Sequence, residues 1–179
     1  MMENVAKKEP RGLRNNNPLN IRYVAKNRWQ GKVLAAYKKD DEFEEFVTMY
    51  WGYRAAFILI FNYMNKYGRK TINDIISTWA PAHDGNATGW YIEEVAERIG
   101  IPSDQQLSFT DGKTMMQLVQ EMTRVECGRF IELPPIAHGY YLACKSLGLT
   151  PNFGPRENLF KKNYDEMQKF AEKLERDMI

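Results

Sequence analysis

The spacing of hydrophobic residues predicts a chain that is mostly helical from about residue 50 onward. Between Gly52 and Tyr67, apolar side chains recur at intervals of three and four residues, which places them on one face of a helix. Gly68 follows as the expected stop, because glycine readily adopts the left-handed conformation that ends helices. Further helices are expected over residues 71–79, 88–98, 110–127, 134–147 and 156–179.

Capping residues support these helix boundaries. Thr71 precedes Ile72-Asn73-Asp74, so its side chain is expected to accept a hydrogen bond from the backbone N–H of Asp74. That helix should end before Pro81, because the residue before a proline is disfavoured in helical geometry. Gly100 and Gly148 mark two later helix ends.

The segment before residue 50 has a different pattern. Residues 15–18, Asn-Asn-Asn-Pro, indicate a turn, and the alternation of polar and apolar residues after it is typical of short strands. Strands are expected over residues 20–24, 33–37 and 42–47, with a turn at residues 29–31. The sequence therefore predicts a small antiparallel sheet near the N-terminus and a fold of the α+β class in which helix dominates.

Length and composition favour one main domain with a C-terminal appendage. The 179 residues are 44% hydrophobic, which is enough apolar surface for one core. Residues 156–179 carry six basic and six acidic side chains with few apolar ones. We therefore expect a domain over residues 1–155, followed by a charged, exposed helix over residues 156–179.

The formal net charge of +2 hides an uneven distribution. Residues 1–39 hold ten basic side chains and two acidic ones, whereas residues 40–46 hold five carboxylates and no base. The overall balance excludes a strongly basic nucleic-acid coat and an acidic disordered tail. The chain instead has a basic beginning followed by an acidic cluster.

Cysteine and histidine are too sparse to indicate a metal centre. Cys127 and Cys144 are expected to be free, buried thiols, and with only His83 and His138 their spacing matches no common zinc pattern. Neither a metal nor another cofactor is expected.

The sequence contains no apolar run that predicts a membrane span or a signal peptide. The run at residues 55–60 is too short to cross a bilayer and is expected to form a buried helix face. The first residues lack the apolar stretch of a signal peptide. We expect synthesis in the cytoplasm, with action at the cell wall only after export by a virion, a holin or a conjugation apparatus.

Glu126 is the first candidate for catalysis. It lies near the end of an apolar-faced helix, two residues before Gly128. Apolar neighbours and the negative end of a helix dipole both disfavour an ionised carboxylate, so the pKa should rise and the group could act as a general acid. A solvated surface glutamate is the alternative interpretation.

Two polar segments are the other candidates. Residues 11–22 contain four asparagines and three arginines, an array of donors suited to hydroxyl, amide or carboxylate groups. The alternative is a turn whose asparagines satisfy its own backbone. In the acidic cluster at residues 40–46, Asp40 and Asp41 are candidate catalytic carboxylates, although charge runs are usually solvated surfaces.

Several motifs within about residues 11–130 resemble a family of phage and prophage lysozyme-like virion proteins, which carry an RNNNPxNIR motif. They are RNNNPLNIR at residues 14–22, WQG at 29–31, DxxFxxF at 40–46, GYRA at 52–55, TIxxIIxxWAP at 71–81 and YI at 91–92. The resemblance implies a phage or prophage protein that degrades peptidoglycan, the polymer of the bacterial cell wall.

The resemblance also implies a lysozyme-like fold in an altered order. The predicted hairpin is similar to that of glucosaminidases and lytic transglycosylases, whose catalytic glutamate lies on a helix before the hairpin. Residues 122–128 are similar to the helix end that carries the acid in goose-type lysozymes and lytic transglycosylases. We therefore expect a circularly permuted arrangement, in which the helix of Glu126 follows the hairpin and faces the asparagine-rich strand.

By this resemblance the protein is expected to be a muramidase or lytic transglycosylase with Glu126 as the general acid. Asp40 or Asp41 would stabilise oxocarbenium character or position water. Substrate-binding roles are expected for Asn16, Asn17, Asn20, Arg22, Trp29, Trp90 and Tyr91, the tryptophans by stacking on sugar rings.

The expected partners are glycan strands of peptidoglycan, together with other proteins of a virion or a secretion apparatus. Nucleic acid is not an expected partner. Two alternatives remain at this point. One is a non-catalytic structural protein of a phage or mobile element, and the other is a nucleic-acid module that uses the basic beginning with Tyr23 and Trp29.

Overall fold

The computed structural model describes residues 8–179, and these residues form seven α-helices and two short 3-10 helices. Residues 1–7 lie outside the described residues. They include part of the basic beginning and part of the segment for which no signal peptide is expected. The elements are α1 (Arg11–Arg14), η1 (Ala35–Tyr37), α2 (Met49–Tyr67), α3 (Ile72–Trp79), η2 (Ala82–Asp84), α4 (Thr88–Ile99), α5 (Gly112–Cys127), α6 (Leu133–Leu147) and α7 (Leu159–Asp177).

The helices expected from hydrophobic spacing are confirmed. Thr71 caps α3 by accepting from the Asp74 backbone N–H at 3.0 Å, and Asp74 accepts from the Thr71 N–H in return. Gly68, Gly100 and Gly148 follow α2, α4 and α6 with positive φ angles. Local signals were sufficient here because caps and stops act within a few residues.

The predicted antiparallel sheet over residues 20–47 is wrong, and with it the α+β class. Within residues 8–179 the structure holds only isolated bridges and no strand, so the described fold is all-helical. Arg22 pairs with Phe43 and Lys32 with Phe46, each over a single residue, and η1 occupies part of the expected strand at 33–37. The circularly permuted lysozyme-like order that rested on this hairpin falls as well.

Backbone and side-chain hydrogen bonds together hold this segment. The Glu44 N–H donates to the Ile21 carbonyl at 2.9 Å and the Tyr23 N–H to the Glu42 carbonyl at 2.8 Å, around the single bridge of Arg22 and Phe43. The Asn17 amide donates to the carbonyl oxygens of Ile21 and Glu44, both at 2.9 Å. The Lys38 ammonium donates to the Phe43 carbonyl at 2.6 Å. Asn20 adopts a φ angle of 51°, which breaks extended geometry at the start of the first expected strand. The segment with the alternating pattern, residues 20–47, therefore forms an ordered loop region with single bridges.

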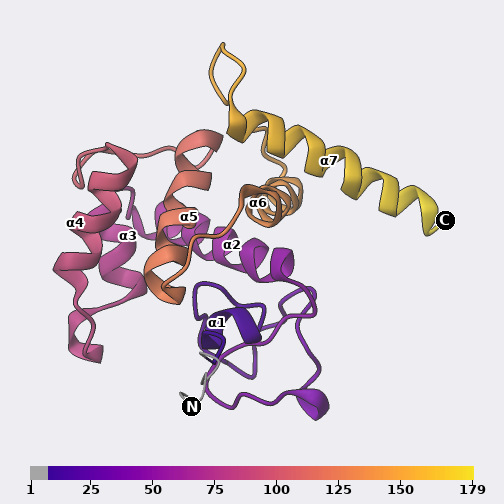
Figure 1. Cartoon of the computed structure of the whole chain (residues 1–179), viewed down its shortest axis with the longest axis horizontal. Coiled ribbons are helices and arrows are strands. Elements are labelled where there is room, and N and C mark those ends of the chain that lie inside the picture. Colours follow the sequence, from indigo (N-terminus) through magenta and orange to yellow (C-terminus); the bar gives the residue numbers. More distant parts are fainter. Residues whose placement is uncertain (1–7) are drawn as a thin grey trace, which may run out of the picture.

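Helices α2 and α6 pack against each other in the middle of the molecule (Figure 1). Their shared core includes Phe57 and Tyr140, whose ring centroids lie 4.9 Å apart. Helices α3, α4 and α5 lie on one side, and α7 crosses α6 and extends beyond it (Figure 1). The N-terminal loop region, residues 8–48, lies at the bottom of that view beneath α2.

Cys127 and Cys144 are free and buried, as expected. Among the described helices, none combines the length and apolar character needed to cross a bilayer.

Candidate functional site

Glu126 faces a cavity of about 460 Å³ at the junction of α5, α3 and the N-terminal loop region. It lies on the last turn of α5, which ends at Cys127 and is followed by Gly128 in the left-handed conformation. The cavity is lined by Leu19, Asn20, Ile21, Arg22, Phe43, Leu59, Tyr63, Thr78, Trp79, Ala80, Pro81, Asp84, Asn86 and Glu126. A largely buried carboxylate thus shares an open cavity with aromatic and amide side chains, a combination typical of small-molecule sites.

Two side chains hold the Glu126 carboxylate. The Asn20 amide donates to Oε2 at 2.9 Å, and the Tyr91 hydroxyl lies 3.2 Å from Oε1. Burial raises the pKa of Glu126, and the hydrogen bonds from Asn20 and Tyr91 lower it, with a net upward direction. The same burial, together with the neighbouring Glu126, raises the pKa of the Tyr91 hydroxyl. The pKa of Glu126 is therefore shifted in the direction that a general acid requires.

Close backbone packing sets the position of Asn20. A Cβ atom at Gly12 of α1 would lie 2.9 Å from both the Asn17 carbonyl and the Asn20 side-chain oxygen, and 3.1 Å from the Cys127 sulfur. The Cys127 thiol donates to the Pro18 carbonyl at 3.2 Å, which joins the end of α5 to the asparagine-rich segment. The absence of a side chain at position 12 allows the Asn20 and Glu126 elements to meet.

Helix α3 forms another wall of the cavity. The Trp79 indole donates to the Leu19 carbonyl at 3.0 Å, and its ring lies edge-on to Tyr63 at 6.1 Å. Trp79 thereby connects α3 to the loop segment that carries Asn20. An aromatic ring at the wall offers a surface on which a sugar ring could stack.

The other residues predicted to bind substrate lie in different surroundings. Asn16 donates to the Phe46 carbonyl, and Asn17 is fully buried with its amide on backbone groups. Arg22 lines the cavity, with its guanidinium 5.5 Å from the Phe43 ring centre. Trp29 is partly buried against the core, and Trp90 is 55% exposed. Neither of these two tryptophans lines the cavity of Glu126 in the described part of the chain.

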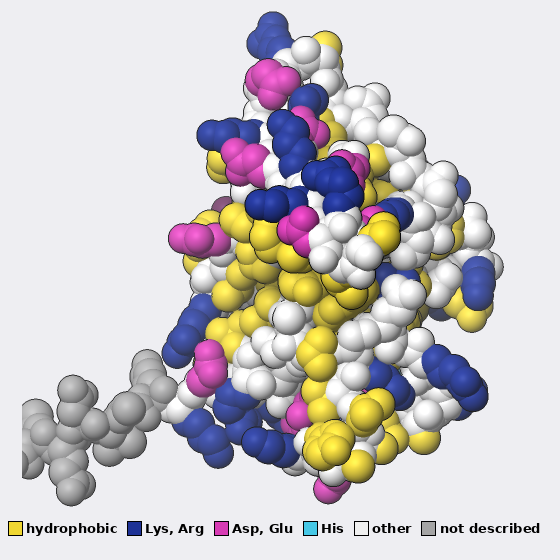
Figure 2. All heavy atoms as spheres, turned by 90° about the vertical axis from the view of Figure 1, so that its right-hand side faces the viewer, with side chains coloured by type: hydrophobic (Ala, Val, Ile, Leu, Met, Phe, Trp, Pro, Cys, Tyr) yellow, Lys and Arg dark blue, Asp and Glu magenta, His cyan; other side chains and the backbone are white. Residues whose placement is uncertain are grey.

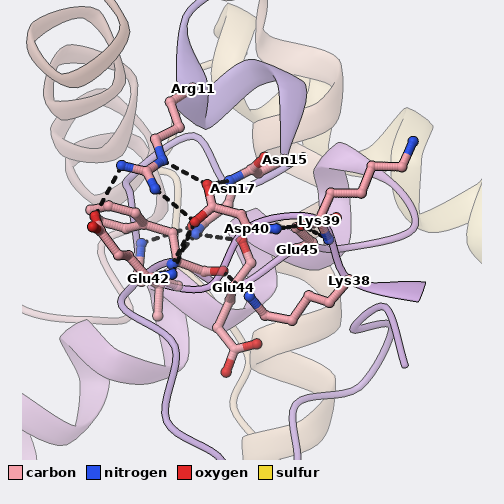
Figure 3. Close-up of polar contacts among 11 residues, drawn as sticks. Arg11, Asn15, Asn17, Lys38, Lys39, Asp40, Glu42, Glu44 and Glu45 are labelled. Atoms are coloured by element: carbon pink, nitrogen blue, oxygen red, sulfur yellow. Dashed lines mark hydrogen bonds and ion pairs between the residues drawn. The ribbon is translucent and has the colours of Figure 1, made fainter. Parts of the chain in front are cut away.

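Asp40 is enclosed by hydrogen-bond donors, among them Arg11 and Asn15 (Figure 3). Arg11 donates to both Asp40 oxygens at 2.6 and 2.8 Å, and Asn15 donates to one of them at 2.7 Å. Hydrogen bonds from the Arg11 guanidinium, followed by those of Asn15 and two backbone N–H groups, hold the pKa of Asp40 well below its usual range. Asp41 is exposed, and neither aspartate is among the described residues lining the cavity.

Glu44 is a second buried carboxylate in the same acidic cluster. Its side chain points away from the Asp40 and Arg11 pair (Figure 3). It is fully buried, and burial raises its pKa. In residues 8–179 both of its oxygens lack a hydrogen-bond partner, and it does not line the cavity of Glu126.

Sequence reasoning missed several residues of the cavity, foremost Asp84, Trp79 and Tyr63. Asp84 lies on η2, and its carboxylate is within 3.5 Å of the exposed His83 imidazole. The signal for this wall was the TIxxIIxxWAP motif, which ends at Pro81 just before η2. The motif marked a helix end, but only the tertiary structure brings that end beside Glu126.

Comparison with known proteins shows that the chain is similar to a phage protein. No protein-family model matches it. Protein P5 of Pseudoalteromonas phage PM2 is 39% identical to it over 120 residues, which is 66% of this chain and 71% of the phage protein. This identity over most of the relative's length supports the phage origin that the motifs implied. The chain belongs to the family of phage proteins represented by Protein P5 of phage PM2.

Proposed function

We propose that this phage-family protein is a glycosidase that cleaves the glycan strands of peptidoglycan, as a muramidase or a lytic transglycosylase. The observation that carries the proposal is Glu126, a mostly buried carboxyl group with a raised pKa that faces an open cavity. The motif resemblance to lysozyme-like virion proteins supplies the substrate class. Export by a virion, a holin or a conjugation apparatus would bring the protein to the cell wall.

In the proposed mechanism, Glu126 is the proton donor. Its protonated carboxyl group transfers a proton to the oxygen that joins N-acetylmuramic acid to N-acetylglucosamine, and the bond from that oxygen to the anomeric carbon breaks. Asn20 and Tyr91 stabilise the carboxylate that this transfer leaves. Water, or a hydroxyl group of the same sugar, then adds to the anomeric carbon and returns a proton to Glu126.

Asp84 is the proposed second carboxylate in place of Asp40 and Asp41. It lines the cavity that Glu126 faces, whereas the oxygens of Asp40 are occupied by Arg11, Asn15 and backbone donors. A carboxylate at this wall would stabilise positive charge developing on the sugar ring. If Asp84 has no such role, the acetamido group of the substrate would stabilise that charge instead.

The test is a zymogram in which the protein acts on peptidoglycan embedded in a gel. Glu126→Gln keeps the size of the side chain but removes the acidic proton, so we expect clearing to fall by a factor of about 100 or more. Glu93→Gln on α4 is the matched control, because Glu93 is exposed, and it should clear like the wild type. Asp84→Asn is expected to show an intermediate loss.

An inactive wild-type protein would overturn the proposal. It would favour a non-catalytic structural protein of the phage particle, with which membership of the P5 family is equally compatible. Equal clearing by the wild type and Glu126→Gln would also contradict the role of Glu126, while leaving peptidoglycan as the substrate.

A further inference from the structure

A second cavity, of about 640 Å³, lies beneath α7 on another face of the molecule. Its lining comes from the turn at Gln30 and Gly31, from α2, from α6 and from Glu175 of α7. On this face, a band of hydrophobic side chains separates the charged surface of α7 from the N-terminal loop region (Figure 2). Trp51 of α2 and Leu142 of α6 contribute apolar walls to the cavity.

Arg54 of α2 is the unusual residue of this cavity. Its side chain donates to the Ser146 hydroxyl oxygen through Nε at 3.3 Å and through a terminal nitrogen at 2.9 Å. Across residues 8–179, no carboxylate lies within ion-pair distance of the Arg54 guanidinium. Burial lowers the pKa of Arg54 from its usual value. The guanidinium also lies 5.9 Å from the centre of the Trp51 ring, within the range of a cation–π contact. Because its partners here are a neutral hydroxyl and an aromatic ring, Arg54 has capacity for an anionic ligand.

The carboxylate in the lining of this cavity already forms an ion pair with a lysine. Glu175 is the acidic residue of the lining, and both of its oxygens accept from the Lys145 ammonium, at 2.6 and 2.8 Å. The described lining therefore carries two cations and one anion. The positive charge left over belongs to Arg54.

We propose that this cavity binds the terminal carboxylate of a peptidoglycan stem peptide, with Arg54 as its principal contact. A guanidinium presents parallel N–H groups that match the two oxygens of a carboxylate. Trp51 and Leu142 would contact the small apolar side chain beside that carboxylate. Peptidoglycan as the source of the peptide rests on the proposed function, whereas the carboxylate site rests on Arg54 itself.

The experiment is an NMR titration of the full-length protein with acetyl-D-alanyl-D-alanine. The expected Kd is about 1 mM, with shifts at the Trp51 indole N–H and the Ser146 amide. The C-terminal amide of the same dipeptide should bind about ten-fold more weakly, because it lacks the charge. Acetyl-L-alanyl-L-alanine tests the source of the peptide and should also bind more weakly.

Two variants test the assignment to Arg54. Arg54→Lys keeps the positive charge but loses the planar pair of donors, and should weaken binding about ten-fold. Glu175→Gln removes the competing carboxylate and frees Lys145, and should strengthen binding about three-fold. Because the second variant predicts a gain, damage to folding cannot imitate it.

Several results would overturn the inference. They are binding of the amide as tight as that of the acid, unchanged affinity in Arg54→Lys, and shifts that map away from Trp51. An L-dipeptide that binds as well as the D-dipeptide would overturn peptidoglycan as the source of the peptide. Glu126→Gln should bind the dipeptide like the wild type, since Glu126 does not line this cavity. Cleavage without binding would overturn this site alone, and binding without cleavage would overturn the glycosidase alone.

Discussion

Two carboxyl groups of this protein, Glu126 and Asp40, show opposite pKa shifts. Asp40 accepts from the Arg11 guanidinium and from Asn15, and these hydrogen bonds stabilise its ionised form. Glu126 is buried at the end of α5, and burial outweighs its two donors. Both side chains carry a carboxyl group, so their surroundings account for the opposite directions of the two pKa shifts. These surroundings favour Glu126 as the proton donor.

The first prediction concerns the donors to Glu126. Asn20 and Tyr91 stabilise the ionised carboxylate, so Asn20→Ala and Tyr91→Phe should each raise the pKa of Glu126. A ¹³C NMR titration of the Glu126 carboxyl carbon measures this pKa, and it needs no enzymatic activity. A pKa that falls in either variant would show that the hydrogen bonds favour the protonated form instead.

At the scale of elements, the site depends on how closely short segments approach one another. Helix α1 lies against the end of α5, and Gly12 is the point of contact with Asn20 and Cys127. A similar approach occurs at Gly52 of α2, where a Cβ atom would lie 2.0 Å from the Asn16 carbonyl oxygen. These two glycines hold the asparagine-rich segment between helices.

The second prediction compares glycines in two helices. Gly12→Ala should destabilise the protein by about 1–3 kcal/mol, because backbone and a sulfur atom must move to admit the methyl group. Gly89→Ala on α4 is the control, because a Cβ there meets no atom within 4 Å, and it should stabilise by about 0.5 kcal/mol. Chemical denaturation measures both free energies of unfolding, and equal effects of the two substitutions would contradict this account of α1.

At the scale of the whole molecule, the uneven charge of the sequence is partly neutralised by folding. Arg11 forms ion pairs with Asp40 and Glu42, so the basic beginning lies against the acidic cluster that follows it. Helix α7 is attached differently, through Tyr164, which packs against Tyr140 and Tyr141 of α6. Glu175 of α7 also contacts α6, since both of its carboxylate oxygens accept from the Lys145 ammonium.

The third prediction tests the division at residue 155. A chain that ends at Pro155 lacks Tyr164 and exposes part of α6. Its free energy of unfolding should therefore fall by several kcal/mol, which corresponds to a decrease in Tm of about 10 °C. No residue of α7 lines the cavity of Glu126 in the described chain, so the NMR signal of Glu126 should keep its pKa. An unchanged Tm would mean that α7 contributes little to the core, and a shifted pKa would mean that it supports the cavity.

Local rules explain which predictions from the sequence succeeded. The Thr71 cap, the glycines after the helices and the three- to four-residue spacing act within one element, so they defined α2 to α6 without knowledge of the fold. The pattern at residues 20–47 failed because sheet formation requires a partner ladder. There, backbone pairing occurs only at isolated bridges, and the Asn17 and Lys38 side chains donate to the carbonyl groups of Glu44 and Phe43.

By itself, the sequence determined the helices after residue 50, the glycines that follow several of them, and the placement of Glu126 at the end of an apolar-faced helix. The tertiary structure decided what surrounds that glutamate, since Asn20 lies 106 residues away in the chain and Asp84 comes from another helix end. It also decided that Asp40 pairs with Arg11 and that, in the described chain, no carboxylate lies within ion-pair distance of Arg54. Such pairings depend on distances across the fold, and no local pattern of residues encodes them.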